Sequence, residues 1–414
     1  MSLLNEKHHS IIKSIFSKKM LIVGLMGFSS GLPFLLIGST LKAWLTEAKV
    51  DLQVIGFFSL VGIPYSFKFL WAPLMDHYKL FSFGRRKSWL LLTQICLSAG
   101  LLVLSVAQPG ESIQMVGAIA ILIAFFSASQ DIVVDAYRRE ILDSEEQGFG
   151  STLYVNFYRI ALLFSGGFAL YLADHFPWSR VYQIMAMTML ANTLCTILAP
   201  EPKVNFRSAN LLGAFVEPLR EFFSRKNAWL ILSFIVFYKV GESMASDMTT
   251  PFYLKMGFSK TEIAGVVKFF GFWATIFGAF AGGILLIRIS AGRALLLFGC
   301  LQSLALLGFS ILATQGAQVS LLAAVVTAEN FTSGMATTAL LAFMANQCDK
   351  RFSATQYSLL SSLSSVPRVF AGSLTGILAV HMGWQYFFLV CTLITIPGLI
   401  LVFRLGRVDS QYRI

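Results

Sequence analysis

Twelve long apolar runs constrain the fold of this chain more than any other feature. An α-helix rises about 1.5 Å per residue, so a run of about 20 apolar residues crosses the hydrocarbon core of a bilayer. The runs occupy residues 20–46, 52–75, 88–107, 113–137, 149–173, 180–199, 227–254, 260–288, 294–313, 318–346, 354–379 and 383–404. Strands of a transmembrane β-barrel are shorter and alternate in polarity. The sequence therefore predicts an all-α integral membrane protein with twelve transmembrane helices.

The distribution of basic residues predicts the topology of the chain. Most of the 32 Lys and Arg residues fall in the N-terminal tail, the even-numbered loops and the C-terminal tail, while the opposite side holds Lys42, Lys49, Arg180, Lys255 and Lys260. Cytoplasmic loops carry the excess of basic residues, so both termini are expected in the cytoplasm. The net charge of +11 follows from this bias. We therefore expect a lipid bilayer around the chain and no nucleic acid partner.

The stretch 200–226 divides the chain into two halves. It is the longest stretch between apolar runs, and it contains apolar residues at helical spacing with basic residues nearby. This pattern predicts an amphipathic helix on the cytoplasmic face, bent at Pro218. We expect an N-terminal six-helix bundle at 1–199, a cytoplasmic linker at 200–226 and a C-terminal six-helix bundle at 227–414.

The two halves show internal repetition. Arg159 precedes Gly167 in the fifth run by the same spacing that separates Arg368 from Gly376 in the eleventh. The fifth and eleventh runs hold equivalent places in two six-helix halves. Parallel six-helix repeats joined by a cytoplasmic linker are typical of the major facilitator fold.

A loop signature of that fold follows the second run. The signature reads G-x-x-x-D-R/K-x-G-R-R/K, and this chain carries it with extra residues between the acid and the second glycine. The corresponding loop after the eighth run has Ile287 in place of the acid. The signature predicts a gate at the cytoplasmic mouth, formed by Asp76, Gly84, Arg85 and Arg86.

Charged residues lie in the central part of seven of the twelve runs, and the third, sixth, ninth and twelfth runs have none apart from Arg180 and Arg404 at the end of a run. A charge in hydrocarbon is costly, and it persists where it faces a partner helix or a water-filled path. In the major facilitator arrangement the four uncharged runs are the outer helices. This pattern predicts a transporter.

Membrane carboxylates are candidates for proton coupling, because a carboxylate that becomes neutral loses most of its burial cost. The candidates are Asp131, Asp135, Glu242 and Glu329. Asp131 and Asp135 share a helix face, so either one is protonated or cations such as Arg159 and Lys68 lie against them. Any of these acids can instead belong to a permanent ion pair. Lys239 is three residues before Glu242 and is placed to form one.

Other classes of protein lack support in the sequence. There is no phosphate-binding G-x-x-x-x-G-K-S/T loop, so the driving energy must come from a gradient or from the substrate's own concentration difference. The five Cys are scattered and the five His lie outside the runs or at their ends, so we expect no metal site and no cofactor. An enzyme would need a nucleophile, base and acid at one place, and the runs contain no such set.

Several stretches of the chain carry a closer resemblance. They are GFSSGLP at 27–33, IGFFSLVGIPYSFKFLWAPLMD at 55–76, SASQDIVVDA at 127–136, SGGFALYLAD at 165–174 and FSATQYSLLSSL at 352–363. These stretches resemble the AmpG-type muropeptide permeases. The resemblance implies a bacterial inner-membrane importer, driven by the proton motive force, that brings anhydromuropeptides into the cytoplasm for cell-wall recycling. It also implies an indirect influence on β-lactamase induction.

The cargo implied by the resemblance carries sugars, carboxylates and an amine. Charged, amide and aromatic side chains in the runs suit such a cargo, and the candidates are Tyr65, Gln130, Arg159, Lys239, Lys268, Asn330 and Arg368. The same set suits a peptide, acetyl-coenzyme A or a siderophore, which stay open as alternative cargoes. We expect the transporter to work as a monomer.

Overall fold

The computed structural model describes residues 17–50, 54, 58–203, 211–259 and 262–411. These residues are helical with short connections, and none of them lies in a strand. Ten helices in the described part are long and apolar enough to cross a membrane. By their contacts the residues form two compact units, one of 1–219 with 348–359 and the other of 220–347 with 360–414.

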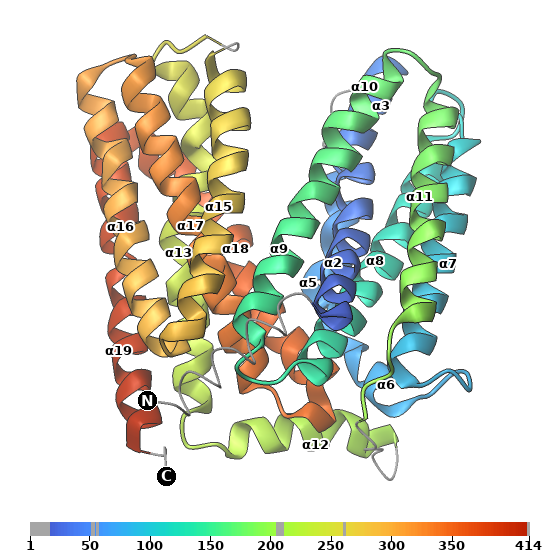
Figure 1. The fold of residues 1–414 in the computed structure, drawn as a ribbon. Coiled ribbons are helices and arrows are strands. Elements are labelled where there is room, and N and C mark those ends of the chain that lie inside the picture. Colours follow the sequence, from blue (N-terminus) through green and yellow to red (C-terminus); the bar gives the residue numbers. More distant parts are fainter. Residues whose placement is uncertain (1–16, 51–53, 55–57, 204–210, 260–261, 412–414) are drawn as a thin grey trace. The chain divides into compact units, whose positions relative to one another are not determined.

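The first unit is built around two pairs of long helices (Figure 1). One pair is α2 with α9, and the other is α7 with α11. The backbones of α2 and α9 approach closely at Gly27, where a Cβ atom would lie 2.5 Å from the carbonyl oxygen of Tyr154. The long elements are α2 (Lys18–Leu36), α3 (Ser39–Glu47), α7 (Arg85–Ser105), α8 (Ile113–Ile141), α9 (Gln147–Leu163) and α11 (Trp178–Leu198). Between α9 and α11 lie the π-helix η3 (Phe164–Phe168) and α10 (Ala169–Ala173).

One predicted span differs in the structure. Instead of one helix over 52–75, the described residues form four short segments: η1 (Phe58–Gly62), α5 (Ile63–Phe67), η2 (Lys68–Leu70) and α6 (Ala72–His77). Pro64 and Pro73 lie in the first turns of α5 and α6. A proline lacks the backbone N–H that would continue the preceding helix, so each one begins a new segment. The last segment, α6, contains Asp76 just before its final residue.

The second unit contains the remaining long helices. Its closest helix pair is α15 with α17, where a Cβ atom on Gly278 would lie 2.0 Å from the carbonyl oxygen of Phe331. The elements are α13 (Ala228–Lys255), the π-helix η4 (Ile263–Phe270), α15 (Gly271–Arg288), α16 (Ala291–Gln315), α17 (Val319–Gln347), α18 (Ser353–Leu393) and α19 (Ile396–Gln411). The backbone of α18 breaks at Gly383, whose φ of 75° interrupts the helix.

Two elements belong partly to each unit. The helix α12 (Leu211–Ser224) runs through Pro218 as one helix, and its residues are divided between the units after Leu219. The loop at 348–352, with the short helix η5 (Lys350–Phe352), and the first turns of α18 belong by contact to the first unit. The residues of α18 are therefore divided between the two units after Leu359.

Candidate functional site

Asp76 caps the start of α18. Its carboxylate accepts hydrogen bonds from the backbone N–H of Ala354 at 3.2 Å, from the backbone N–H of Thr355 at 2.8 Å and from the Thr355 hydroxyl at 2.7 Å. The first N–H groups of a helix have no partner within it and carry a partial positive charge. A buried carboxylate at this position satisfies those donors, so it holds the first turn of α18 against the end of α6.

Arg86 connects this cap to α8. Its side chain is fully buried, and its Nη2 lies 2.6 Å from a carboxylate oxygen of Asp76 and 2.8 Å from the hydroxyl of Ser353. The same guanidinium forms an ion pair with Glu140, and so does that of Arg85. Three of the four residues predicted for the gate, Asp76, Arg85 and Arg86, thus form one network with Glu140. Glu140 was not among the predicted site residues, although it is an acid among basic residues at the end of a span.

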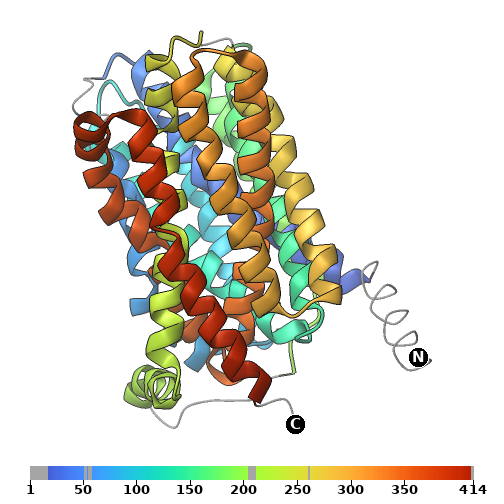
Figure 2. The ribbon, with the colours of Figure 1, turned by 90° about the vertical axis from the view of Figure 1, so that its left-hand side faces the viewer.

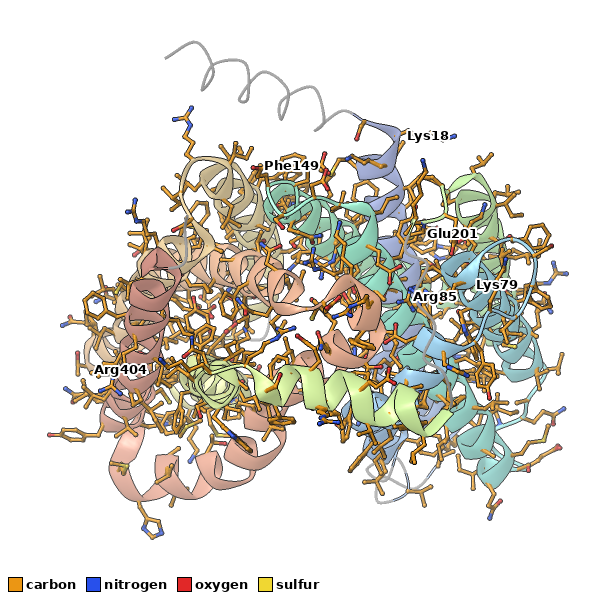
Figure 3. The ribbon with its side chains drawn as sticks, turned by 90° about the horizontal axis from the view of Figure 1, so that it is seen from below. Lys18, Lys79, Arg85, Phe149, Glu201 and Arg404 are labelled. Atoms are coloured by element: carbon orange, nitrogen blue, oxygen red, sulfur yellow. The ribbon has the colours of Figure 1, made fainter. Side chains whose placement is uncertain are left out.

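The fourth predicted gate residue, Gly84, has a backbone that favours glycine. Its φ is +118°, and a Cβ atom there would lie 2.3 Å from the carboxyl carbon of Glu201. That carboxylate accepts hydrogen bonds from the backbone N–H of Arg86 at 2.8 Å and of Lys87 at 3.1 Å. Glu201 therefore caps the start of α7, in the region where Figure 3 labels it with Arg85.

The two predicted acids of α8 have different partners. Asp131 accepts a hydrogen bond from the hydroxyl of Ser30 on α2, and that hydroxyl also lies 3.3 Å from the hydroxyl of Tyr154 on α9. Asp135 lies 4.0 Å from Nζ of Lys68 and 3.3 Å from Nη2 of Arg138. Lys68 is one of the two cations expected beside these acids. Arg138 was not expected there.

Arg138 connects α8 to α9 and to the start of α18. It is fully buried, and it donates from Nη1 to the hydroxyl of Ser151 at 2.7 Å and from Nη2 to the hydroxyl of Tyr357 at 2.6 Å. Its guanidinium carbon lies 4.9 Å from the ring centre of Tyr154 and 5.3 Å from that of Tyr357. Both distances suit cation–π contacts. The spacing of three residues between Asp135 and Arg138 was the signal that could have revealed this pair.

Several buried polar atoms of the first unit have no hydrogen-bond partner among the described residues. Gln130 donates from Nε2 to the hydroxyl of Ser29 at 3.0 Å, while its Oε1 has no partner among the described residues. Both polar atoms of the Asn156 amide are likewise buried without a partner there. Asn156 precedes Arg159 by about one turn of α9, and Arg159 is partly buried. Buried polar groups without partners cost free energy, so they are available to a polar ligand.

The remaining candidate residues are Tyr65 and those of the second unit. The rings of Tyr65 and Phe34 form an edge-to-face pair with centres 5.7 Å apart, and the hydroxyl of Tyr65 is buried. Lys239 and Glu242 form an ion pair within α13, and the other carboxylate oxygen of Glu242 accepts a hydrogen bond from Ser333 at 2.7 Å. This is the pairing that was the alternative to a binding role. Glu242 also lines a small cavity with Tyr238, Gln302, Ser303 and Thr395.

The other candidates of the second unit are less informative. Asn330 accepts from the hydroxyl of Thr275 at 3.1 Å and donates to the carbonyl of Val326 at 3.0 Å, so both ends of its amide take part in packing. Glu329 lies beside it on α17 and is partly buried. The side chains of Lys268 and Arg368 lie outside the described part. Among the described residues there is no group of three or more His, Cys, Asp or Glu placed to hold a metal ion.

Comparisons with known proteins identify the family. The Major Facilitator Superfamily profile matches residues 20–372. The chain is 45% identical over 384 residues to the anhydromuropeptide permease of Escherichia coli K12, covering 92% of this chain and 78% of the permease. It is 35% identical over 397 residues to transporter AmpG 4 of Rickettsia conorii, covering 92% and 95%. A crystal structure of the E. coli fucose:proton symporter has the same fold, with a TM-score of 0.72 at 14% identity over 92% of this chain and 97% of the symporter.

The comparisons confirm the predicted fold and the resemblance that the sequence carries. The relatives are transporters and permeases, so this protein is a multi-pass membrane transporter and not an enzyme. The chain belongs to the major facilitator superfamily and, within it, to the AmpG-type permeases.

Proposed function

We propose that this protein is a proton-coupled importer of anhydromuropeptides in a bacterial inner membrane, with both termini in the cytoplasm. The observation that carries the proposal is the 45% identity to the E. coli anhydromuropeptide permease, which extends over 92% of this chain. The imported fragments would enter cell-wall recycling and thereby influence β-lactamase induction. The cargo and the protons are its small-molecule partners, and it acts as a monomer.

The acids of α8 support proton coupling. Asp131 has a hydroxyl donor in Ser30, and Asp135 has the cations Lys68 and Arg138 within 4.0 Å. These two environments differ, because a hydroxyl compensates a negative charge less than two cations do. Asp131 is therefore the acid that takes up and releases the proton. Each elementary charge moved across the membrane contributes about 2.3 kcal/mol per 100 mV.

The unpaired polar groups near these acids support a binding role for the first unit. Oε1 of Gln130 and the amide of Asn156 have no partners in the described structure, and Arg159 lies one turn after Asn156. Amides suit the hydroxyl and acetamido groups of a sugar, and an arginine suits a peptide carboxylate. Tyr65 adds an aromatic face. In the second unit, Lys268 and Arg368 remain candidates for carboxylates of the cargo.

The capped helix start supports a gate. While Asp76 and Arg86 hold the first turn of α18, the chain at 348–359 is fixed to the first unit. We expect the cytoplasmic mouth of the transporter to be closed in that state. Opening the cytoplasmic mouth would require Asp76 to release the start of α18. The polar groups that had been paired there would then be hydrated.

Uptake into vesicles tests the proposal. Purified protein in proteoliposomes, given an inwardly directed proton gradient, should accumulate radiolabelled anhydromuropeptide, and an uncoupler should abolish the accumulation. Unlabelled acetyl-coenzyme A, peptides and siderophores should not compete. If one of these solutes exchanges through the protein while the muropeptide does not, the assignment of the cargo is wrong.

A further inference from the structure

The helix α12 has one face that packs on the protein. Ala214, Pro218 and Phe222 recur every four residues and are buried, with Phe222 fully so. The amide of Gln356 donates to the carbonyl of Pro218 at 3.1 Å. These contacts account for about one third of the helix circumference. The rest of the helix circumference lies outside this buried face.

A second apolar face of the same helix is exposed. Leu212, Val216, Leu219 and Phe223 are spaced by four, three and four residues, with exposed fractions of 74%, 50%, 39% and 39%. At 3.6 residues per turn this spacing aligns them in one stripe. The stripe is centred roughly 130° from the buried face, by the same geometry. Phe215 lies between the two faces and makes them one continuous apolar surface.

The remaining arc of α12 is polar. It contains Glu217, Arg220, Glu221 and Ser224. Around its axis the helix therefore has three faces: one toward protein, one apolar and exposed, and one polar. A helix that lay in water beside a protein would need only the first and the third. The additional apolar face is typical of a helix that lies at the boundary between water and a bilayer.

The exposed stripe continues onto a membrane-crossing helix. The ring of Phe223 contacts that of Trp229 with centres 5.2 Å apart, and Trp229 is 72% exposed in the first turn of α13. Residues Ala228–Tyr253 of α13 are long and apolar enough to span the bilayer. Tryptophan is enriched at the level of the lipid head groups. Figures 1 and 2 show α12 from the side and nearly end-on, respectively.

Charges at the edge of the stripe suit a phospholipid surface. Arg220 is exposed at the edge of the polar arc that adjoins the stripe, and Lys226 is exposed just after the helix. Arg225, by contrast, forms an ion pair with Glu221 at 2.7 Å and lies over the ring of Phe222. Long basic side chains beside an apolar face reach lipid phosphates while their stems stay among the acyl chains.

We propose that α12 is an interfacial helix, with Leu212, Val216, Leu219 and Phe223 inserted at the boundary of head groups and acyl chains in the adjacent leaflet. Arg220 and Lys226 bind the phosphates of that leaflet, with a preference for anionic lipid. The bilayer thereby holds the segment that links the two halves of the chain. This inference does not depend on the identity of the transported solute.

Depth-dependent quenching tests the inference on the full chain. An encoded fluorescent amino acid is placed at Val216, and the matched control carries it at Glu217 on the polar arc. In nanodiscs that contain phosphatidylglycerol and nitroxide-labelled lipid, we expect quenching at Val216 to exceed that at Glu217 at least twofold. Iodide in the water should quench the probe at Glu217 more strongly. Replacing Arg220 and Lys226 together with Ala should reduce the lipid quenching at Val216 when the labelled lipid is anionic.

Two results would overturn the inference. Equal lipid quenching at Val216 and Glu217 would mean that the stripe does not enter the bilayer. Protection of the probe at Val216 from both iodide and nitroxide lipid would mean that a second copy of the chain or another protein covers the stripe. Size-exclusion profiles of both labelled proteins establish that they are folded.

Discussion

Nη2 of Arg138 donates a hydrogen bond to the hydroxyl of Tyr357 at 2.6 Å while it lies 3.3 Å from the carboxylate of Asp135. One guanidinium therefore joins an acid of the membrane interior to the first turns of α18. Arg138 and Tyr357 are separated by 219 positions in the sequence, yet both belong to the first unit. A change in the charge of Asp135 acts on Arg138, and through Arg138 on the place where α18 begins.

Tyr357→Phe should slow transport without unfolding the protein. The phenyl ring keeps the cation–π contact with Arg138 but loses the hydroxyl, and a hydrogen bond to a charged group contributes about 1.5–3 kcal/mol. We expect the initial rate of uptake to fall several-fold at equal protein amounts in vesicles. Tyr171→Phe, at a side chain that is 59% exposed, is the matched control. An unchanged rate for Tyr357→Phe would separate this contact from transport.

Asp76→Asn should slow transport while leaving the protein inserted. The amide retains one acceptor oxygen, but it loses the negative charge that faces Arg86 and the start of α18. Caps of this kind contribute about 0.5–2 kcal/mol, so the closed state should be less populated and not lost. Uptake at matched expression measures the effect, with the exposed Asp174→Asn as control. Equal rates for both variants would contradict the gating role.

Gly84→Ala should lower the thermal stability of the purified protein. A side chain at φ +118° is strained, and its Cβ would overlap Glu201, so we expect a loss of about 1–3 kcal/mol. Glu201→Ala removes the overlap but also removes the cap of α7. The loss caused by Gly84→Ala should therefore be smaller in the Glu201→Ala background. If the two losses simply add, then Glu201 does not press on this position.

Long continuous helices were predictable because hydropathy alone defines them. The spans that became α7, α8 and α17 are long, mainly apolar runs without an internal proline. The second run does not form a single helix, because Pro64 and Pro73 lack the backbone N–H groups that would continue it. Hydropathy does not detect this loss. Both prolines are present in the sequence, so a break in the helix at each of them could have been predicted.

The membrane charges of the candidate site could be found from the sequence where they lie deep in an apolar run, as with Asp131 and Lys68. Arg138 and Glu140 were missed, since charges at the ends of spans also report topology. Their burial depends on Ser353 and Tyr357, which are more than 200 positions away in the sequence. No local pattern contains that contact. Sequence reasoning therefore finds the acids more easily than it finds their partners.

The orientation of the linker is testable with single cysteines. The positive charge bias predicts that Lys226 faces the cytoplasm and that Lys255, at the end of α13, faces the periplasm. With Cys300 replaced by Ser, Lys255→Cys should react with an impermeant maleimide in intact cells, and Lys226→Cys should react only after lysis. The reverse pattern would place the linker in the periplasm and contradict the two-bundle arrangement.

Asp131→Asn should abolish accumulation driven by the proton gradient and spare exchange. The amide is a neutral stand-in for the protonated acid, so substrate can still bind and cross while the proton step is lost. Counterflow with substrate on both sides measures exchange, and uptake under an imposed proton gradient measures coupling. Arg159→Ala should reduce both, because it removes a candidate substrate contact on α9. If Asp131→Asn vesicles still accumulate substrate, another acid carries the proton. Glu242 or Glu329 would then be the next candidate.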